Sequence, residues 1–477
     1  MLTEAQKKAL AYNKSLCMTA SAGTGKTSTL VNRYLHLIED SGCKPSEILA
    51  LTFTDKAAAE MKDRLLKETY KREEPFWNEI KDEMIWARVS TFHSFCWGLI
   101  KEFSMESGID PSFSVLDDIT LTKIMNEGIQ KLFMRKEHDD IRQCTAYCLV
   151  AWGEYQTRTY LETLYRKRHI ARSFFASFES DPGGVIADWQ AYLESIRQQL
   201  IDSLRTDEDF MAALRSLSEF AADYCGGGDA ATRYLDQIAP YLDAVLSASS
   251  TDEVCRALAA LATTKGGKAN MGSKKVFGGH LEDLRKAYTT MSVTVKALPE
   301  NILTIDLDPG SPAMKVTLDL IRALHTAYSS FERYVEQEKR KMGMIDFTDM
   351  IDIAYRMIQV YPSIGRILNM RYRFLMVDEF QDTDPVQNGI IMKILSFGEE
   401  NSKKLFIVGD PKQSIYLFRD ADVTQFTQTR DTIKRWGGEE IPLDENFRST
   451  PAIIHFVNGL FARIFTDTGN AWDFSYE

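Results

Sequence analysis

The sequence has no long apolar run, few cysteines and no excess of positive charge. Because no stretch of about 18 apolar residues is present, and no signal-peptide-like run opens the chain, nothing in it predicts a membrane span or secretion. Seven cysteines, an odd number in 477 residues, do not suit a secreted disulfide framework. The sequence therefore predicts a cytoplasmic protein in a reducing compartment, with no membrane among its partners.

The charge balance excludes one class of nucleic-acid binder but not all of them. Lys and Arg number 57 against 68 Asp and Glu, which gives a net charge of −11. A protein that coats nucleic acid would be basic overall, whereas contact with phosphates needs only a local basic strip. Hydrophobic residues make up 44% and charged residues 26%, a globular balance, and the length of 477 residues favours two or three domains.

The two ends of the sequence show the alternation of strands and helices that is typical of a parallel sheet. Short apolar runs at Leu16–Thr19 and Ile48–Thr54 each lead into a helical pattern, and such runs return at Phe374–Val377 and Leu405–Val408. Between about residues 111 and 340 helical periodicity dominates. The pattern predicts an α/β fold, with a parallel sheet assembled from both ends of the chain around a large, mostly helical insertion.

A glycine-rich loop follows the first predicted strand. The segment Ala20–Thr27 reads ASAGTGKT, which matches the Walker A pattern except for Ala at the first position. Small residues let backbone N–H groups surround phosphate oxygens, Lys26 would contact the β- and γ-phosphates, and the Thr27 hydroxyl would bind Mg²⁺. A plain glycine-rich turn is the alternative, but a loop between a strand and a helix favours a site for ATP.

A second motif supplies two acids at a strand end. The segment Phe374–Asp384 reads FLMVDEFQDTD, an apolar run that ends in Asp378 and Glu379. Asp378 would bind Mg²⁺, and Glu379 would orient and deprotonate the attacking water. Neighbouring residues of a strand point to opposite faces, so the two carboxylates can take different roles. Alone the motif could be a solvated strand end; beside the glycine-rich loop it predicts hydrolysis of Mg-ATP.

Together with their neighbours, these motifs resemble the UvrD/Rep-like superfamily 1 helicases over about residues 2–104 and 344–456. The similar segments are LTEAQKKAL at 2–10 (the Q motif), LTFTDKAAAEMKDRL at 51–65 (motif Ia), VSTFHSFC at 89–96 (the next DNA-contacting motif), LFIVGDPKQSIYLFRDAD at 405–422 (motif III) and LDENFRST at 443–450 (motif IV). The resemblance implies a RecA-like P-loop ATPase lobe that couples hydrolysis of ATP to movement on single-stranded DNA.

The resemblance also assigns residues to the nucleotide. Arg448 offers a planar guanidinium to the γ-phosphate, and Gln413 would sense that phosphate. Gln6 would recognise the adenine edge, and Phe447 would stack on the base. The predicted catalytic residues are Glu379, Lys26, Gln413 and Arg448. The predicted nucleotide-binding residues are Gln6, Ala20, Ser21, Ala22, Gly23, Thr24, Gly25, Lys26, Thr27, Ser28, Phe447 and Arg448. The predicted metal ligands are Thr27 and Asp378.

Aromatic rings interleaved with cations characterise proteins that bind single-stranded DNA without regard to sequence. In the resembling motifs we expect Phe53, His93 and Phe418 to contact DNA, whereas Tyr416 could instead pack inside the protein. The predicted DNA-binding residues are Phe53, Thr54, Lys56, His93, Tyr416, Phe418 and Arg419. Asp420 stands where many family members have glycine, which places a carboxylate near the expected path of the DNA.

Three features are more similar to the AddA/RecB branch, whose members are motors of helicase–nuclease machines at double-strand ends. They are the long insertion, the ASAGTGKT spelling and the segment MIDFTDMI at 344–351. The branch implies single-stranded DNA and duplex ends as partners, and its further candidate partner is a nuclease or helicase protein of the same machine. Within the insertion, YRKRHIAR at 165–172 suits either a grip on duplex phosphates or a solvated helix face, and the sequence leaves both open.

The resemblance also implies a division of the chain. We expect a first part of the RecA-like lobe at 1–108, a 1B-like helical insertion at 109–310, the second part of the lobe at 311–442 and the start of a second lobe at 443–477. Family motors carry motifs V and VI in that second lobe, and neither is found, so we expect a truncated motor that hydrolyses ATP weakly by itself. The predicted function is an ATP-dependent DNA helicase or translocase of DNA repair or recombination. The alternative is a non-catalytic scaffold of a helicase–nuclease complex that binds nucleotide and DNA.

Overall fold

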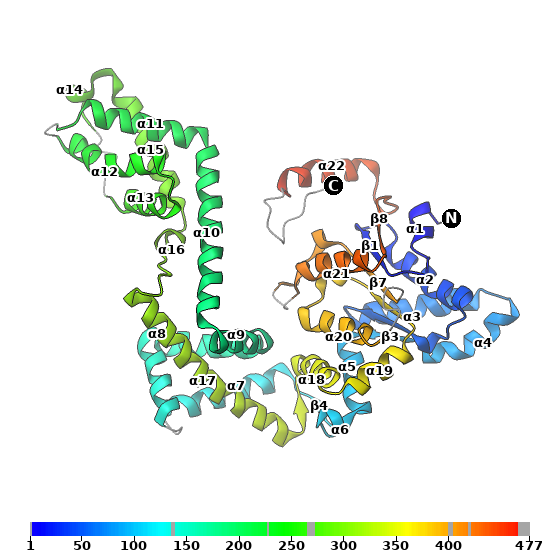
Figure 1. The fold of residues 1–477 in the computed structure, drawn as a ribbon. Helices are drawn as coiled ribbons and strands as arrows, with labels where there is room; N and C mark the ends of the chain where they lie inside the picture. The colour runs from blue at the N-terminus through cyan, green and yellow to red at the C-terminus, as the bar shows by residue number, and fades with distance from the viewer. Residues whose placement is uncertain are drawn as a thin grey trace. The chain divides into compact units, whose positions relative to one another are not determined.

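The computed structural model describes residues 2–134, 139–226, 229–264, 272–398, 404–417 and 421–465. The chain divides into two compact units (Figure 1). One unit joins residues 1–130 to residues 332–477, and the other consists of residues 131–331. Both ends of the chain therefore build one unit, and the middle builds the other. The finer boundaries that the family resemblance implies stay a prediction.

The first unit is built on a six-stranded sheet in the order β3-β2-β6-β7-β1-β8, with every neighbouring pair parallel. The strands are β1 (Leu16–Ala20), β2 (Ile48–Thr52), β3 (Arg88–Thr91), β6 (Phe374–Val377), β7 (Leu405–Gly409) and β8 (Glu439–Leu443). Leu49 of β2 lies opposite Leu375 of β6, and Met18 of β1 lies opposite Val408 of β7. The predicted parallel sheet assembled from both ends of the chain is confirmed.

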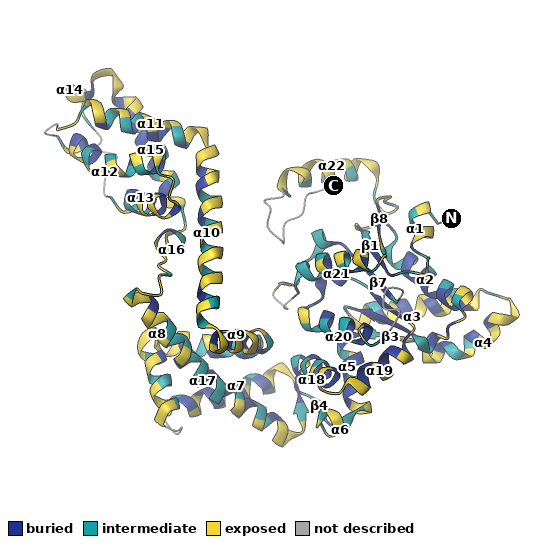
Figure 2. Cartoon of the chain, in the orientation of Figure 1, coloured by how far each residue is buried: buried dark blue, intermediate teal, exposed yellow. Residues whose placement is uncertain are grey.

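Continuous apolar strands predict a sheet that is covered on both faces. All residues of β2, β6 and β7 are buried, and Figure 2 shows the sheet in the colour of buried residues. Along β7, Leu405 and Ile407 belong to one hydrophobic core, while Phe406 and Val408 belong to another. Since side chains alternate along a strand, the two cores lie on opposite faces of the sheet.

Helices form both covering layers. One core includes residues of α5 (Phe92–Glu102), α18 (Phe347–Val360), α19 (Pro362–Arg371), α20 (Pro385–Leu395) and α21 (Val423–Arg435). The other includes residues of α2 (Lys26–Ser41), α3 (Asp55–Tyr70) and α4 (Pro75–Glu83). The unit also contains α1 (Glu4–Lys8), α6 (Ser104–Ser107), α22 (Pro451–Ile464), the 3-10 turns η1 (Pro45–Glu47), η2 (Met84–Trp86), η5 (Phe380–Asp382) and η7 (Pro411–Gln413), and the strand pair β4 (Ser114–Val115) and β5 (Met344–Ile345).

Hydroxyl caps fix the points at which two helices begin after their strands. Thr54 Oγ1 accepts a hydrogen bond from Ala57 N at 3.1 Å at the start of α3, and Thr91 Oγ1 accepts one from Ser94 N at 3.2 Å at the start of α5. Each such cap contributes about 1 kcal/mol to helix stability. The caps place Phe53 and His93, which adjoin them in sequence, at the junctions between strand and helix.

The second unit contains only helices among its described residues. It comprises α8 (Asp139–Arg166), α9 (Arg168–Ser180), α10 (Pro182–Thr206), α11 (Glu208–Asp223), α12 (Ala230–Ser247), α13 (Thr251–Thr263), α14 (Lys274–Phe277), η4 (Gly278–His280), α15 (Leu281–Ala297) and α16 (Glu300–Thr304). Two long helices cross its boundaries, α7 (Asp118–Phe133) and α17 (Pro312–Met342). Residues of α10 to α16 share one hydrophobic core. The prediction of a large helical insertion is confirmed.

The basic segment at 165–172 spans the end of α8 and the start of α9. Tyr165 and Arg168 are buried, and Arg168 Nη1 donates to the Tyr165 carbonyl oxygen at 3.3 Å. Arg166 and Arg172 are exposed. The segment is therefore partly core and partly surface, and a role in gripping duplex DNA stays a prediction for its exposed residues.

Two further observations concern the chain as a whole. Its seven cysteines are free thiols, as expected for a protein without a disulfide framework. Among the described residues, no helix is both long enough and apolar enough to cross a membrane.

Candidate active site at the carboxyl edge of the sheet

The predicted site residues follow strands that all end at one edge of the sheet. β1 leads into the 20–28 loop, β6 into Asp378 and Glu379, β7 into Gln413 and Tyr416, β8 into Phe447 and Arg448, β2 into Phe53 and Lys56, and β3 into His93. Ligands of open α/β sheets bind at this carboxyl edge. Because β3 and β2 occupy one end of the strand order, Phe53, Lys56 and His93 lie at that end. Tyr416 follows β7, among the strands whose loops carry the residues predicted for nucleotide.

The glycine-rich loop closes on itself before α2. Thr24 Oγ1 donates to the Ser21 carbonyl oxygen at 2.8 Å. Gly23 and Gly25 have φ of 83° and 87°, in the left-handed region that favours glycine. Lys26 is the first residue of α2, so its backbone N–H lies at a helix N-terminus, where the helix dipole favours an anion. The loop therefore has the geometry of a phosphate cradle.

Lys26 and Glu379 form an ion pair across the site. Lys26 Nζ lies 3.1 Å from Glu379 Oε2, and the Lys26 side chain is 13% exposed. Glu379 has φ of 49°, the only positive value at a non-glycine residue among the described parts of the chain. That conformation costs about 1 kcal/mol and turns the side chain out of the line of β6. Two of the four predicted catalytic residues, Lys26 and Glu379, are thus in contact.

Carboxylates are crowded beside this ion pair. Burial, and secondly the charge of Glu379, raise the pKa of Asp378 to about 6. The same two causes raise the pKa of Asp382 to about 6. In the described chain no group of three His, Cys, Asp or Glu could hold a metal ion by itself. A single buried carboxylate at Asp378 with the Thr27 hydroxyl fits Mg²⁺, which takes one or two carboxylates and completes its shell with phosphate oxygens and water.

Gln413 is held by the loop that follows β7. Its side-chain Nε2 donates to Asp410 Oδ2 at 2.7 Å, and its backbone N–H donates to the Asp410 carbonyl oxygen at 2.8 Å. Asp410 is 4% exposed, so this turn is anchored at the end of the strand. The structure places Gln413 on the same edge as Lys26 and Glu379, with its amide turned to Asp410.

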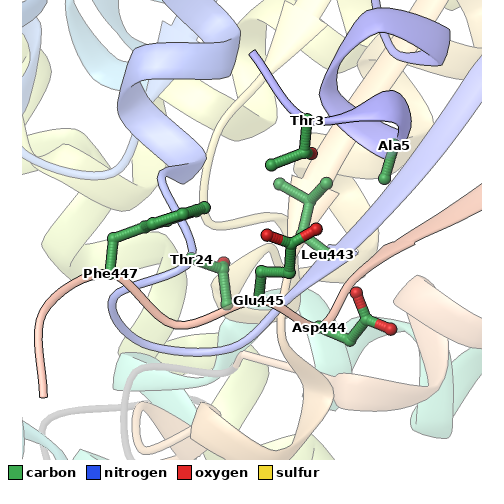
Figure 3. A pocket seen from close by; sticks show the side chains of 7 residues that line it. All are labelled: Thr3, Ala5, Thr24, Leu443, Asp444, Glu445 and Phe447. Carbon is green, nitrogen blue, oxygen red and sulfur yellow. The ribbon is translucent and has the colours of Figure 1, made fainter. Parts of the chain in front are cut away.

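The side of the site predicted for adenine is formed by α1 and by the segment after β8. Gln6 is buried: its Nε2 donates to the Thr24 carbonyl oxygen at 3.3 Å, and its Oε1 accepts from Thr3 N at 3.0 Å. A shallow hollow adjoins these contacts (Figure 3). Its lining residues are Thr3, Ala5, Thr24, Leu443, Asp444, Glu445 and Phe447. Phe447 is 62% exposed, so its ring is accessible for stacking.

Asn446, which we did not predict, fastens the segment after β8 to the glycine-rich loop. Its Nδ2 donates to the Ala22 carbonyl oxygen at 2.7 Å, and Phe447 N donates to the Gly23 carbonyl oxygen at 2.9 Å. Asn446 Oδ1 accepts from the backbone N–H groups of Arg448 and Ser449, both at 2.9 Å. Asn is common in turns because its side chain can accept hydrogen bonds from backbone N–H groups that follow it in the chain. This preference was the sign of a turn that the sequence offered. The turn brings Arg448 directly over Gly23.

On the side predicted for DNA, the structure brings Phe53 and Tyr416 together. Their ring centroids are 4.6 Å apart with an interplanar angle of 36°. Tyr416 therefore packs on Phe53, and a role in contacting DNA stays a prediction for both rings. Lys56 has an 87% exposed side chain, and Thr54 is exposed as well as capping α3. Phe418, Arg419 and Asp420 lie outside the described residues.

A second ring pair includes a residue that we did not predict. His93 and Phe347 meet edge to face with centroids 5.4 Å apart, and Phe347 is 56% exposed. Phe347 is the first residue of α18, which is capped by Asp346. Lys339 Nζ binds both Asp349 Oδ2 at 2.6 Å and Asp346 Oδ2 at 3.3 Å. This buried ion network fixes the start of α18 and with it the position of the exposed ring.

Comparison with known proteins extends these observations to nearly the whole chain. A model of the UvrD/REP helicase N-terminal domain matches residues 2–434. Proteins named as subunits of an ATP-dependent helicase/nuclease are similar over 97% of this chain: that of Natranaerobius thermophilus is 28% identical and covered over 38% of its length. That of Lactobacillus delbrueckii subsp. bulgaricus is 28% identical and covered over 40%, and that of Listeria monocytogenes is 25% identical and covered over 39%. The chain thus spans about two fifths of the length of these relatives, and the resemblance stated from the motifs is confirmed.

Proposed function

The chain belongs to the UvrD/REP helicase family, and we propose that it works as part of an ATP-dependent DNA helicase motor. The observation that carries this proposal is the contact of Lys26 with Glu379, at 3.1 Å, beside a loop with the geometry of a phosphate cradle. A lysine that binds the phosphates and a residue that positions the water are two of the parts on which hydrolysis of ATP depends. Both residues are present and lie next to each other.

The contacts suggest how the side chains would act when ATP binds. The γ-phosphate competes for Lys26, so the ammonium would leave Glu379 and neutralise phosphate charge. Glu379 would then be able to orient a water molecule and accept its proton. Thr27 and Asp378 would hold Mg²⁺, which would neutralise part of the phosphate charge. Arg448 would add a second cation at the γ-phosphate, in the position that the Asn446 turn gives it.

The adenine end of the nucleotide would lie by the hollow between α1 and Phe447. The exposed Phe447 ring offers a stacking face. The Gln6 amide already binds the Thr24 and Thr3 backbone, so it would have to exchange one of these hydrogen bonds to reach the base. The cradle residues 20–28 would surround the phosphates.

Single-stranded DNA would lie across the rings at the β2 and β3 end of the edge, of which Phe347 is exposed and Phe53 and His93 are partly exposed. Phe53, His93 and Phe347 offer rings, and the exposed Lys56 offers a charge for a phosphate. Stacking on rings beside cations tolerates any base, which suits a motor that moves along DNA of any sequence. Phe418 and Arg419 stay candidates for the same surface.

The names of the relatives suggest the wider setting. They are called subunits of an ATP-dependent helicase/nuclease, so we propose that the whole protein works with a nuclease or helicase partner at double-strand ends in DNA repair. A cytoplasmic location is part of the same proposal. The non-catalytic scaffold is the alternative, and the intact Lys26, Asp378 and Glu379 disfavour it.

Phosphate release by the whole protein with Mg-ATP, measured with and without an oligo-dT strand, tests the motor against the scaffold. We expect hydrolysis that needs Mg²⁺ and rises when the oligonucleotide is added. A protein that binds both ligands but releases no phosphate above the level seen in EDTA would instead support the scaffold. Equilibrium titration of a fluorescent ATP analogue, with and without the oligonucleotide, establishes that both ligands are bound under the conditions of the assay.

A further inference from the structure

Gln381 has no assigned role in the function proposed above, yet its side chain joins two parts of the site. Gln381 lies in η5, the turn that begins directly after Glu379, and it is 2% exposed. Its Nε2 donates to Glu379 Oε2 at 2.9 Å and to Asp382 Oδ2 at 3.3 Å. Its Oε1 accepts from Asp410 N at 3.0 Å. One buried amide therefore links the proposed catalytic base to the loop that follows β7.

The end of β7 is shaped to admit this amide. A Cβ placed on Gly409 would collide with Gln381 Oε1 and would lie 3.2 Å from Gln381 N. Only an amide of this length offers an acceptor for Asp410 N and donors for the two carboxylates at once. A glutamate at this position would lose the donors, and a methionine of similar size would lose donors and acceptor alike.

Residues 410–417, which we call the β7 loop, extend from this amide to the rings of the DNA side. Ser414 Oγ donates to the Gln381 carbonyl oxygen at 3.3 Å. Two residues later Tyr416 packs on Phe53 with ring centroids 4.6 Å apart. A continuous set of contacts thus runs from Phe53 through the β7 loop to Gln381 and on to Glu379.

The carboxylate of Glu379 depends on Gln381 most when nucleotide is present. Lys26 Nζ and Gln381 Nε2 both contact the same oxygen, Oε2. If Lys26 moves to the phosphates, Gln381 is left as the side-chain donor that fixes the direction of that oxygen. An error of about 1 Å in the placement of a catalytic group can lower a rate by about 100-fold.

We propose that Gln381 is a positioning residue that holds the Glu379 carboxylate in line with the attacking water and lets the β7 loop move it. DNA that displaces Tyr416 from Phe53 would shift the β7 loop, and the amide would carry this shift to the base. Hydrolysis would then be fast only when DNA occupies the rings. This inference rests on the proposed motor function and adds the side chain through which DNA stimulates it.

The test, made in the whole protein, is Gln381→Met, which keeps the volume of the side chain and removes its hydrogen bonds. We expect kcat for DNA-stimulated hydrolysis to fall by about 10- to 100-fold, with KM for ATP unchanged within about 2-fold. We also expect the ratio of stimulated to unstimulated rate to fall towards one. Ser414→Ala, a milder change at the other end of the link, should lower that ratio by a few fold without loss of folding.

Asn388→Leu is the matched control. Asn388 is also a buried amide, 8% exposed, and its Nδ2 donates to Gln425 Oε1 at 2.9 Å and to Thr429 Oγ1 at 3.1 Å. It should lower the melting temperature by an amount similar to Gln381→Met but leave the stimulation ratio at the wild-type value. The melting temperatures thus separate lost stability from lost positioning.

The outcomes distinguish the inference from the function on which it rests. A stimulated wild type with a Gln381→Met variant of equal kcat and equal ratio would overturn the inference alone. An equal loss of stimulation in Asn388→Leu would overturn it too, because any lost amide would then suffice. A wild type that binds ATP and DNA without stimulated hydrolysis would overturn the motor function and the inference together.

Discussion

The carboxyl edge of the sheet has a nucleotide half, which holds Lys26 and Glu379, and a DNA half, which holds Phe53 and His93. The two halves differ in how far their side chains form hydrogen bonds and ion pairs within the protein. On the nucleotide half, Lys26 pairs with Glu379, the buried Gln6 binds backbone on both sides, and Gln381 is bonded at both ends of its amide. On the DNA half, Lys56 is 87% exposed and Phe347 is 56% exposed. Phe53 meets Tyr416 there and His93 meets Phe347, and such ring contacts depend less on direction than hydrogen bonds do.

The difference matches the two tasks that we propose for the edge. Hydrolysis requires groups fixed within about half an ångström, and hydrogen bonds to neighbouring side chains provide that precision. Binding any sequence of single-stranded DNA requires exposed π faces and charges that tolerate different bases. Substitutions on the nucleotide half should therefore affect turnover steeply, and substitutions on the DNA half should affect affinity in small steps.

The largest expected effect is that of Glu379→Gln on turnover by the whole protein. Removal of the proposed base should lower DNA-stimulated hydrolysis by about 10³-fold, within the range usual for general base catalysis. Nucleotide and DNA should still bind, because the cradle and the rings are untouched. Phosphate release and titration with a fluorescent ATP analogue measure the two quantities. Glu68→Gln, at an exposed pair with Lys71, is the control; a Glu379→Gln enzyme of nearly normal rate would remove Glu379 from the mechanism.

Next in size is the effect of Lys26→Ala on nucleotide affinity. Loss of a charge-assisted contact with the phosphates should weaken Mg-ATP by about 2 kcal/mol or more, roughly 30-fold in Kd. Affinity for oligo-dT in the absence of nucleotide should stay the same, since Lys26 lies on the nucleotide half. If both affinities fell together, the two halves would not be separate sites. Lys44→Ala, at a partly exposed pair with Glu83, controls for the loss of one positive charge.

The crowded carboxylates of the nucleotide half should also lower the free energy of unfolding at neutral and alkaline pH. The pKa of Asp382, about 6, lies above its ordinary value of 3.8, so the folded state disfavours the ionised form. Below about pH 4 the Asp382 carboxyl is protonated in both the folded and the unfolded state, so its burial costs no free energy of ionisation. As pH rises from there through about 6, the unfolded state ionises more readily, and the free energy of unfolding falls. Asp382→Asn should therefore raise the free energy of unfolding by about 2 kcal/mol at pH 8 and by little at pH 4.

Urea unfolding of both proteins across this pH range, without Mg²⁺ or nucleotide, measures the effect. Asp63→Asn provides the comparison, because Asp63 is an exposed partner of Lys67 with an ordinary surface environment. Its difference from wild type measures the effect of removing one exposed carboxylate. A flat difference for Asp382→Asn would show that the carboxylates are not under strain.

Much of this arrangement could be predicted from the sequence because it depends on local patterns. The apolar run at Leu405–Val408 and the glycines before Lys26 each determine their structure over a few residues, and the parallel strands then collect their ends at one edge. The roles of the individual residues stay predictions, including those of Gln413 and Arg448. The order of the halves along the edge follows from the strand order, which the sequence alone did not provide.

The links between motifs could not be predicted, because they join residues far apart in the chain. Asn446 binds Ala22 across 424 positions, and Gln381 binds Asp410 across 29. Nothing in the local pattern distinguishes Gln381, whose partners become evident only with Gly409 beside it. Phe347 follows a helix cap and gives no sign in sequence that its ring meets His93. The contact of Tyr416 with Phe53 likewise joins two positions far apart in the chain.

Asn446→Ala should have a smaller effect, on the nucleotide half. The substitution removes the hydrogen bond to Ala22 and the two that shape the turn before Arg448. We expect affinity for Mg-ATP to fall by about 1 kcal/mol, the usual net value of a hydrogen bond, while affinity for Mg-ADP changes less because Arg448 is proposed to serve the γ-phosphate. Titrations with both nucleotides measure this difference. An equal loss for both would mean that Asn446 supports the cradle and not Arg448.

The smallest expected effect concerns Phe347 on the DNA half. A ring that stacks on a base contributes about 1 kcal/mol or a little more, so Phe347→Ala should weaken oligo-dT by about 5-fold. The ring has no charge, so the slope of log Kd against log salt should not change, whereas Lys56→Ala should reduce that slope by about one phosphate contact. Anisotropy of a labelled oligonucleotide at several salt concentrations measures both quantities.

Because α18 is fixed by Lys339 and Asp349, loss of the exposed ring should leave the fold intact. Unchanged affinity in Phe347→Ala, with a changed slope in Lys56→Ala, would show that charge alone holds the DNA on this half.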